Sequence, residues 1–182
     1  MAQLATSLLQ LAQDKDVAVE EATEIVHAMP AQLEAAWLRR FGAKIGLSAP
    51  KGDDLELVQS LLSLMQDGNA DFTNMFWSLG KPAARDQFTN RDAFDLWEAA
   101  WKARLVDEPD PAALMAQSNP AIIPRNHRVE EVIVAGRLGD HAPFHALLSA
   151  VTNPYAPLTD TTAPFARAPS KDEQVTRTFC GT

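Results

Sequence analysis

The chain has 182 residues, of which 46% are hydrophobic and 22% are charged, a composition typical of one globular domain with a packed core. Its 24 acidic residues outnumber its 16 basic residues, and this balance argues against a protein that neutralises the phosphates of a nucleic acid. No apolar run reaches the roughly 18 residues of a membrane span, and no basic segment precedes an apolar one as in a secretory signal, so we expect a cytoplasmic protein without a membrane partner.

Apolar residues recur at helical spacing along most of the chain, which predicts an all-α fold, an irregular domain of about seven to nine helices. The first helix carries Leu4, Leu8 and Leu11 on one stripe. A second begins near Asp16, and we expect Pro30 to end or kink it. The apolar pattern then continues to Gly46, which suits the left-handed position after a helix.

Polar residues at capping positions mark the following helices. Asp53 and Glu56 have the spacing of a capping box, with Asp in place of the usual Ser or Thr. Asp71 and Asn90 are expected to cap the next two helices, and Asp110 precedes a proline at a plausible first helical position. Two further helices are predicted over about residues 126–137 and from about residue 140 to 151, with Asn126 capping the first of them.

The composition changes near residue 153, where four prolines enter a stretch rich in Thr and Ala. A helix cannot persist through such a sequence, so we predict an extended tail that lies on a surface or is disordered. The predicted organisation is therefore a helical domain over residues 1–152 and a Pro-rich extended tail over residues 153–182 that ends in Cys180.

Motifs for phosphate and metal chemistry are scarce. The eight glycines are dispersed, and neither a Walker loop nor a kinase glycine-rich loop occurs. The stretch Asp67–Asp71 imitates the start of an EF-hand, but Phe72 and Ser78 stand where Gly and Glu are required, so calcium is rejected. His141 and His145 have the spacing of zinc ligands on one helix face, but a solvated helix start explains them better.

Two clusters have both a functional and a structural interpretation. The segment Arg125–Arg128 combines two guanidinium groups with a helix start, which suits an anion, but we favour a helix cap at Asn126 with both arginines paired to acids of a catalytic lobe. The tryptophans have helical spacing and are expected to lie in the core rather than in a ligand site; they are Trp37, Trp77, Trp97 and Trp101.

Cys180 is the single cysteine of the chain. A thiol on a terminal tail can exchange with another sulfur if its thiolate is accessible, which makes Cys180 a candidate redox residue. The alternative is an unpaired, exposed thiol, and the sequence does not decide between the two.

Five blocks of the chain together resemble the C-terminal region of the selenoprotein O (SelO/YdiU) family of kinase-like protein adenylyltransferases. The resemblance covers nearly the whole chain and departs from the family pattern at Phe41, at Gly42 and in the tail. The blocks are residues 43–47, 68–76, 119–130, 153–155 and 177–180.

This resemblance implies a family activity, the transfer of AMP from ATP to Ser, Thr or Tyr hydroxyls of proteins, with ATP and Mg²⁺ or Mn²⁺ as cofactors. It also implies that the nucleotide- and metal-binding lobe lies N-terminal to this region. We therefore expect no catalytic, cofactor-binding or metal-binding residue in this chain. Its expected partners are the missing catalytic lobe and the protein substrates of the full enzyme, and the resemblance gives Cys180 a redox-regulatory role.

Two alternatives remain. One is a free-standing helical interaction module without enzymatic activity. The other is an independent enzyme that uses His127, His141 or His145, which is disfavoured because no base, nucleophile and anion site assemble in the sequence. If a covering lobe is missing, faces such as Leu4, Leu8 and Leu11 should leave an exposed apolar patch.

Overall fold

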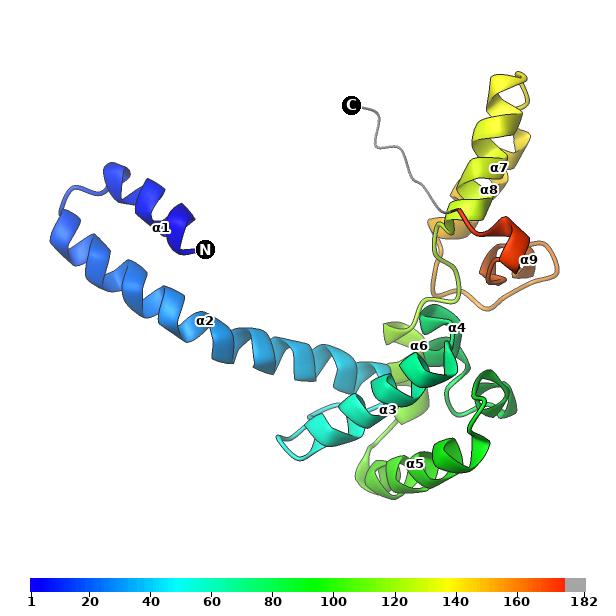
Figure 1. The fold of residues 1–182 in the computed structure, drawn as a ribbon, viewed down its shortest axis with the longest axis horizontal. Coiled ribbons are helices and arrows are strands. Elements are labelled where there is room, and N and C mark those ends of the chain that lie inside the picture. Colours follow the sequence, from blue (N-terminus) through cyan, green and yellow to red (C-terminus); the bar gives the residue numbers. More distant parts are fainter. Residues whose placement is uncertain (176–182) are drawn as a thin grey trace. The chain divides into compact units, whose positions relative to one another are not determined.

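The computed structural model describes residues 1–175, and all regular secondary structure in this part of the chain is helical (Figure 1). This confirms the all-α prediction, and the nine α-helices of residues 1–175 agree with the expected number. The α-helices are α1 Ala2–Leu8, α2 Lys15–Lys44, α3 Asp54–Gly68, α4 Phe72–Ser78, α5 Arg91–Arg104, α6 Pro111–Ser118, α7 Asn126–Arg137, α8 Ala142–Val151 and α9 Ala163–Ala166. Short 3-10 helices are η1 Leu9–Leu11, η2 Pro82–Gln87, η3 Leu105–Asp107 and η4 Lys171–Glu173.

The chain divides into two compact units, Met1–Phe41 and the residues from Gly42 onward. We call them the hairpin unit and the main unit, and α2 passes from the first into the second. The predicted boundary between a helical domain and a tail after residue 152 stays a prediction. Residues 153–175 belong to the main unit.

The hairpin unit consists of α1, η1 and most of α2. The Asp14 carboxylate accepts hydrogen bonds from the backbone N–H groups of Asp16 and Val17, which starts α2 close to its predicted position. Pro30 lies inside α2 and does not end it, so of the two expected effects the stop was wrong, and the kink stays a prediction. A proline in a helix interior costs about 3 kcal/mol. Runs of Ala, Glu and Leu on both sides favour the helix strongly enough to continue it through this site.

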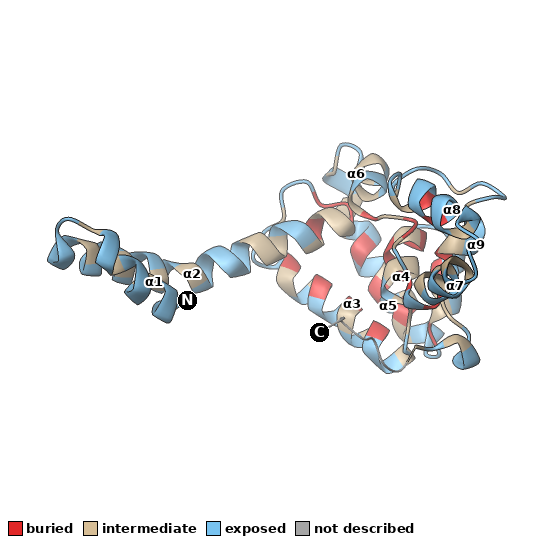
Figure 2. Ribbon diagram, turned by 90° about the horizontal axis from the view of Figure 1, so that it is seen from above, coloured by how far each residue is buried: buried red, intermediate tan, exposed pale blue. Residues whose placement is uncertain are grey.

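The core of the main unit forms where α3, α4 and α5 present their apolar faces (Figure 2). Trp97 and Trp101 are buried there, and their indole N–H groups donate to the carbonyl oxygens of Leu57 (2.8 Å) and Ile45 (2.7 Å). Their core position is therefore confirmed. Trp37 and Trp77 are only partly buried. Trp77 still packs against the small core cluster of Ala121, Ile122, Ala150 and Ala166, so the prediction was too broad for Trp37.

Several predicted helix ends are confirmed by hydrogen bonds from the backbone N–H three residues on. Side chains of Asp71, Asn90 and Asp110 accept these bonds at 2.8, 3.1 and 2.9 Å. The capping box at Asp53 is not formed, because Asp53 itself has helical backbone angles and makes no cap hydrogen bond. The neighbouring Asp54 accepts from the Lys51 N–H at 2.7 Å and pairs with Arg104 instead.

Two glycines are explained by their surroundings. Gly46 has a φ of +86°, the left-handed conformation predicted for the end of the second helical stretch. Gly42 is buried, and a Cβ atom there would lie 2.7 Å from Cγ of Pro50. A side chain at Gly42 would therefore push away the loop that follows α2.

The described part of the predicted tail packs on the main unit. Ala166 of α9 is buried together with Ala121, Ile122 and Ala150. The Arg167 guanidinium donates to both oxygens of Glu173, and the Ser170 N–H donates to the same carboxylate at 2.7 Å. Residues 153–175 thus lie on a surface, one of the two outcomes expected for this segment.

Within residues 1–175, no helix combines the length and the apolar composition that crossing a membrane requires.

Candidate functional site

Four of the five sequence blocks meet around the segment that joins α6 to α7. Asn119 is buried, and its side-chain amide donates to the carbonyl oxygen of Lys44 at 2.8 Å. The Ala121 N–H donates to the carbonyl oxygen of Pro154 at 2.7 Å. Arg125, at the other end of the segment, binds Asp71. We call these six residues the junction, since each sequence block in the described part of the chain contributes to it.

Lys44 is the cation on one side of the junction. Its ammonium donates to Asn119 Oδ1 at 3.3 Å and lies 5.1 Å from the centre of the Phe76 ring. Burial lowers the pKa of Lys44, because the charged form loses water contacts. The aromatic face and the amide oxygen compensate part of that loss.

Arg125 and Asp71 form a two-pronged ion pair on the other side. The two terminal guanidinium nitrogens of Arg125 donate to the two carboxylate oxygens of Asp71 at 2.7 and 2.9 Å, and one of them also reaches Asn74 Oδ1 at 3.0 Å. Burial alone raises the pKa of Asp71, but hydrogen bonds from Arg125 and Asn74 outweigh it and hold this pKa below its usual range. Asp71 therefore both caps α4 and anchors the start of α7.

This geometry corrects two expectations for the segment Arg125–Arg128. Both arginines find acceptors within the chain rather than on another lobe: Arg125 binds Asp71, and Arg128 binds Glu131 and the carbonyl oxygen of Pro164. The N-cap of α7 is Arg125, and Asn126 is already the first helical residue. The structural interpretation of the two arginines is supported, because their terminal nitrogens are already bonded.

His127 is buried beside this ion pair, and neither of its ring nitrogens has a hydrogen-bond partner among residues 1–175. It lines a pocket with Arg125, Asp71, Pro169 and Glu173. Burial lowers the pKa of His127, and the positive charge of Arg128 adds to this effect. The neutral imidazole is therefore the form that the fold stabilises.

We expect the free energy of unfolding to fall as the pH drops below about 6.5, the ordinary pKa of histidine. The unfolded chain takes up a proton there, whereas folded His127 resists protonation because its pKa is lowered. For one proton the slope is at most about 1.4 kcal/mol per pH unit. Urea unfolding between pH 5 and 7 measures it. His127→Leu should flatten the slope, and an unchanged slope in this variant would contradict the assignment to His127.

The remaining candidate residues do not assemble with His127. His141 is the N-cap of α8 and His145 lies one turn later, both exposed. The helices α7 and α8 lie side by side and are joined by a short loop, so His127 in the first turn of α7 is at the far end of this pair from His141 (Figure 1). The stretch of helix from His127 to Arg137 alone spans roughly 15 Å. Cys180 lies outside the described residues, and its redox role stays a prediction.

The sequence analysis missed the partnership of Arg125 with Asp71, although both residues lie inside blocks that were singled out. The available signal was a pair of opposite charges in two different blocks, but the two residues are 54 positions apart in the sequence. It also missed a second ion cluster, in which Arg104 binds Asp54 and Glu108, and Glu108 accepts from Ser48. Arg104 and Glu108 are four residues apart, but no local pattern joins Arg104 to Asp54 or Glu108 to Ser48.

No model of a protein family matches the chain. The chain is similar along its whole length to proteins named protein nucleotidyltransferase YdiU: 56% identical to those of Roseobacter denitrificans and of a Ruegeria species, and 51% identical to that of Ruegeria pomeroyi. Each match covers all of this chain and 38% of the relative. The chain thus spans about two fifths of the length of these relatives, and its correspondence to their C-terminal region stays a prediction. By its sequence, the chain belongs to the YdiU family.

Proposed function

We propose that this chain is a supporting, non-catalytic part of a YdiU-type enzyme that transfers AMP from ATP to Ser, Thr or Tyr hydroxyls of other proteins. The observation that carries the proposal is the 56% identity over all 182 residues to a protein named as a nucleotidyltransferase, of which the chain spans 38%. Its role would be to pack against the part that holds the nucleotide.

ATP and a divalent cation, Mg²⁺ or Mn²⁺, are the groups that such a transfer uses, and the described residues do not fit them. Three carboxylates of the main unit that could serve as metal ligands already accept hydrogen bonds from arginines. They are Asp54 with Arg104, Asp71 with Arg125 and Glu173 with Arg167. Within residues 1–175, no three potential ligands lie close enough together to hold a metal. The proposal therefore places the nucleotide and the metal in the part of the relatives that this chain does not span.

Transfer of labelled AMP to protein tests this division of labour. The chain alone should label nothing above a blank without enzyme, since the described residues offer no group of ligands for the metal that the transfer uses. The chain co-expressed with the unmatched part of the Roseobacter denitrificans relative should label its substrates, and that part alone should be at least tenfold less active. Incorporation by the isolated chain would contradict the proposal.

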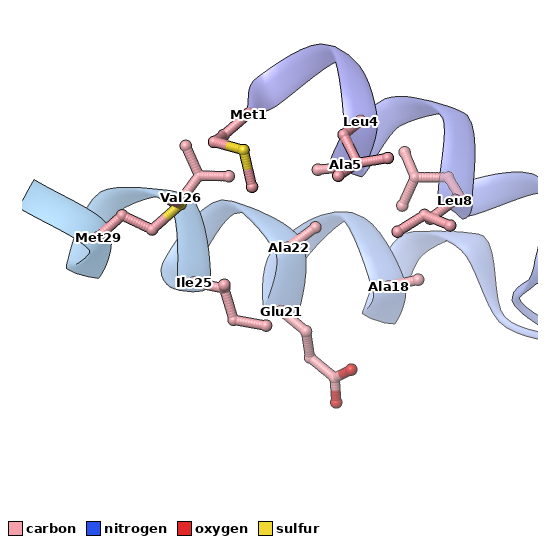
Figure 3. A pocket seen from close by; sticks show the side chains of 11 residues that line it. Met1, Leu4, Ala5, Leu8, Ala18, Glu21, Ala22, Ile25, Val26 and Met29 are labelled. Carbon is pink, nitrogen blue, oxygen red and sulfur yellow. The ribbon is translucent and has the colours of Figure 1, made fainter. Parts of the chain in front are cut away.

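A free-standing interaction module is the second candidate, and the exposed groove of the hairpin unit favours it equally (Figure 3). This candidate differs in one measurable respect. It predicts that the unmatched part of the relative keeps full transfer activity without the chain.

A further inference from the structure

The hairpin unit carries an apolar groove between α1 and the first half of α2. Side chains of Met1, Leu4 and Leu8 project from α1 toward α2 (Figure 3). The groove has a volume of about 300 Å³, and Glu21 is the one charged residue among those that line it. The other lining residues are Ala5, Leu9, Ala18, Ala22, Ile25, Val26 and Met29.

No residue of Met1–Phe41 is buried. Leu4 and Leu8 are each 53% exposed, Ile25 63% and Leu11 81%. This confirms the apolar patch expected at Leu4, Leu8 and Leu11. A helix of seven residues such as α1 does not persist in water without packing, and a contiguous apolar surface on a soluble protein marks an interaction site. The groove therefore requires a covering surface.

Two occupants are conceivable, a second copy of the chain and the remainder of a YdiU protein. A second copy is disfavoured by charge. The stretch of α2 from residue 16 to 38 carries five acidic residues and no Lys or Arg, so two hairpin units placed groove to groove would bring like charges together. The remainder of a YdiU protein is the better candidate because the relatives are longer than this chain. Each relative matches the hairpin residues and has a further 62% of its length outside the match.

We propose that the groove is the docking surface for the part of the YdiU protein that this chain does not span. The occupant is an apolar segment flanked by Lys or Arg residues, which complement the acidic side of α2. This inference rests on the proposed function, since it takes the missing part of the enzyme as the partner.

The test compares two substitutions on α2 with matched exposure. Ile25, at 63% exposure, lines the groove, whereas Leu33, at 64%, does not. The chain is co-expressed with the unmatched part of the Roseobacter denitrificans relative, and binding is measured by titration calorimetry after purification. Ile25→Asp should weaken binding at least tenfold, because it places a charge in an apolar contact. Leu33→Asp should change it less than twofold. Circular dichroism of both variants should match the unchanged chain, since both side chains are exposed.

Equal effects of the two substitutions, or no binding by the unchanged chain, would overturn the proposal. Sedimentation of the chain alone adds a second measurement: a dimer that Ile25→Asp dissociates would assign the groove to a second copy. Failure of the proposed function has a different signature. In that case Ile25→Asp still weakens binding, but the complex transfers no AMP. Conversely, AMP transfer that is stimulated by the chain and unaffected by Ile25→Asp would leave the function standing and remove the groove from it.

Discussion

Replacement of Trp101 by alanine should lower the free energy of unfolding by about 3–5 kcal/mol, the range for removing a buried aromatic side chain. Trp101 is 2% exposed, its ring stacks on Trp97 with centroids 5.6 Å apart, and its N–H donates to the Ile45 carbonyl at 2.7 Å. The substitution removes this packing and leaves a buried carbonyl without its donor. Both losses act in the same direction.

Chemical denaturation followed by circular dichroism measures this change, with Leu96→Ala as the control. Leu96 lies on the same helix, α5, and is 77% exposed, so its loss should change stability by less than about 0.5 kcal/mol. Trp101→Phe should fall between the two, because it keeps an apolar ring but not the donor. A loss below about 1.5 kcal/mol for Trp101→Ala would show that α5 does not anchor the core as described.

Replacement of Arg125 by alanine should cost about 3–5 kcal/mol, because it leaves the half-buried carboxylate of Asp71 without its cation. Arg125 is 7% exposed and holds both oxygens of Asp71. Lysine should rescue little of the loss, since an ammonium cannot reproduce the two parallel hydrogen bonds. The junction, on which four sequence blocks converge, should loosen with it.

The exposed ion pair of Arg91 with Asp86 provides the matched control. Its side chains are 51% and 69% exposed at a separation of 3.0 Å, so Arg91→Ala should cost at most about 1 kcal/mol. A double-mutant cycle with Asp71→Asn then isolates the pair energy. If the effects of Arg125→Ala and Asp71→Asn simply add, the two side chains do not stabilise each other and the junction is incorrectly described.

The helical class and several helix ends were predictable because their causes are local. A cap such as Asp71, Asn90 or Asp110 bonds to a backbone N–H three residues away, so its spacing is visible in the sequence. Where two adjacent acids compete, local spacing is insufficient. Asp54 forms an ion pair with Arg104, which lies 50 residues away in the sequence. Asp53 makes no capping hydrogen bond.

The sequence by itself determined the fold class, the caps at Asp71, Asn90 and Asp110, the left-handed Gly46 and the family. Apolar periodicity, three-residue hydrogen bonds and blocks of similarity are all carried along the chain. The tertiary structure alone decided the partners of Arg125 and Arg128, the burial of His127 and the set of residues that line the groove. Those properties depend on which surfaces meet in space. Charge pairing and burial act through distance, which spacing along the chain does not encode.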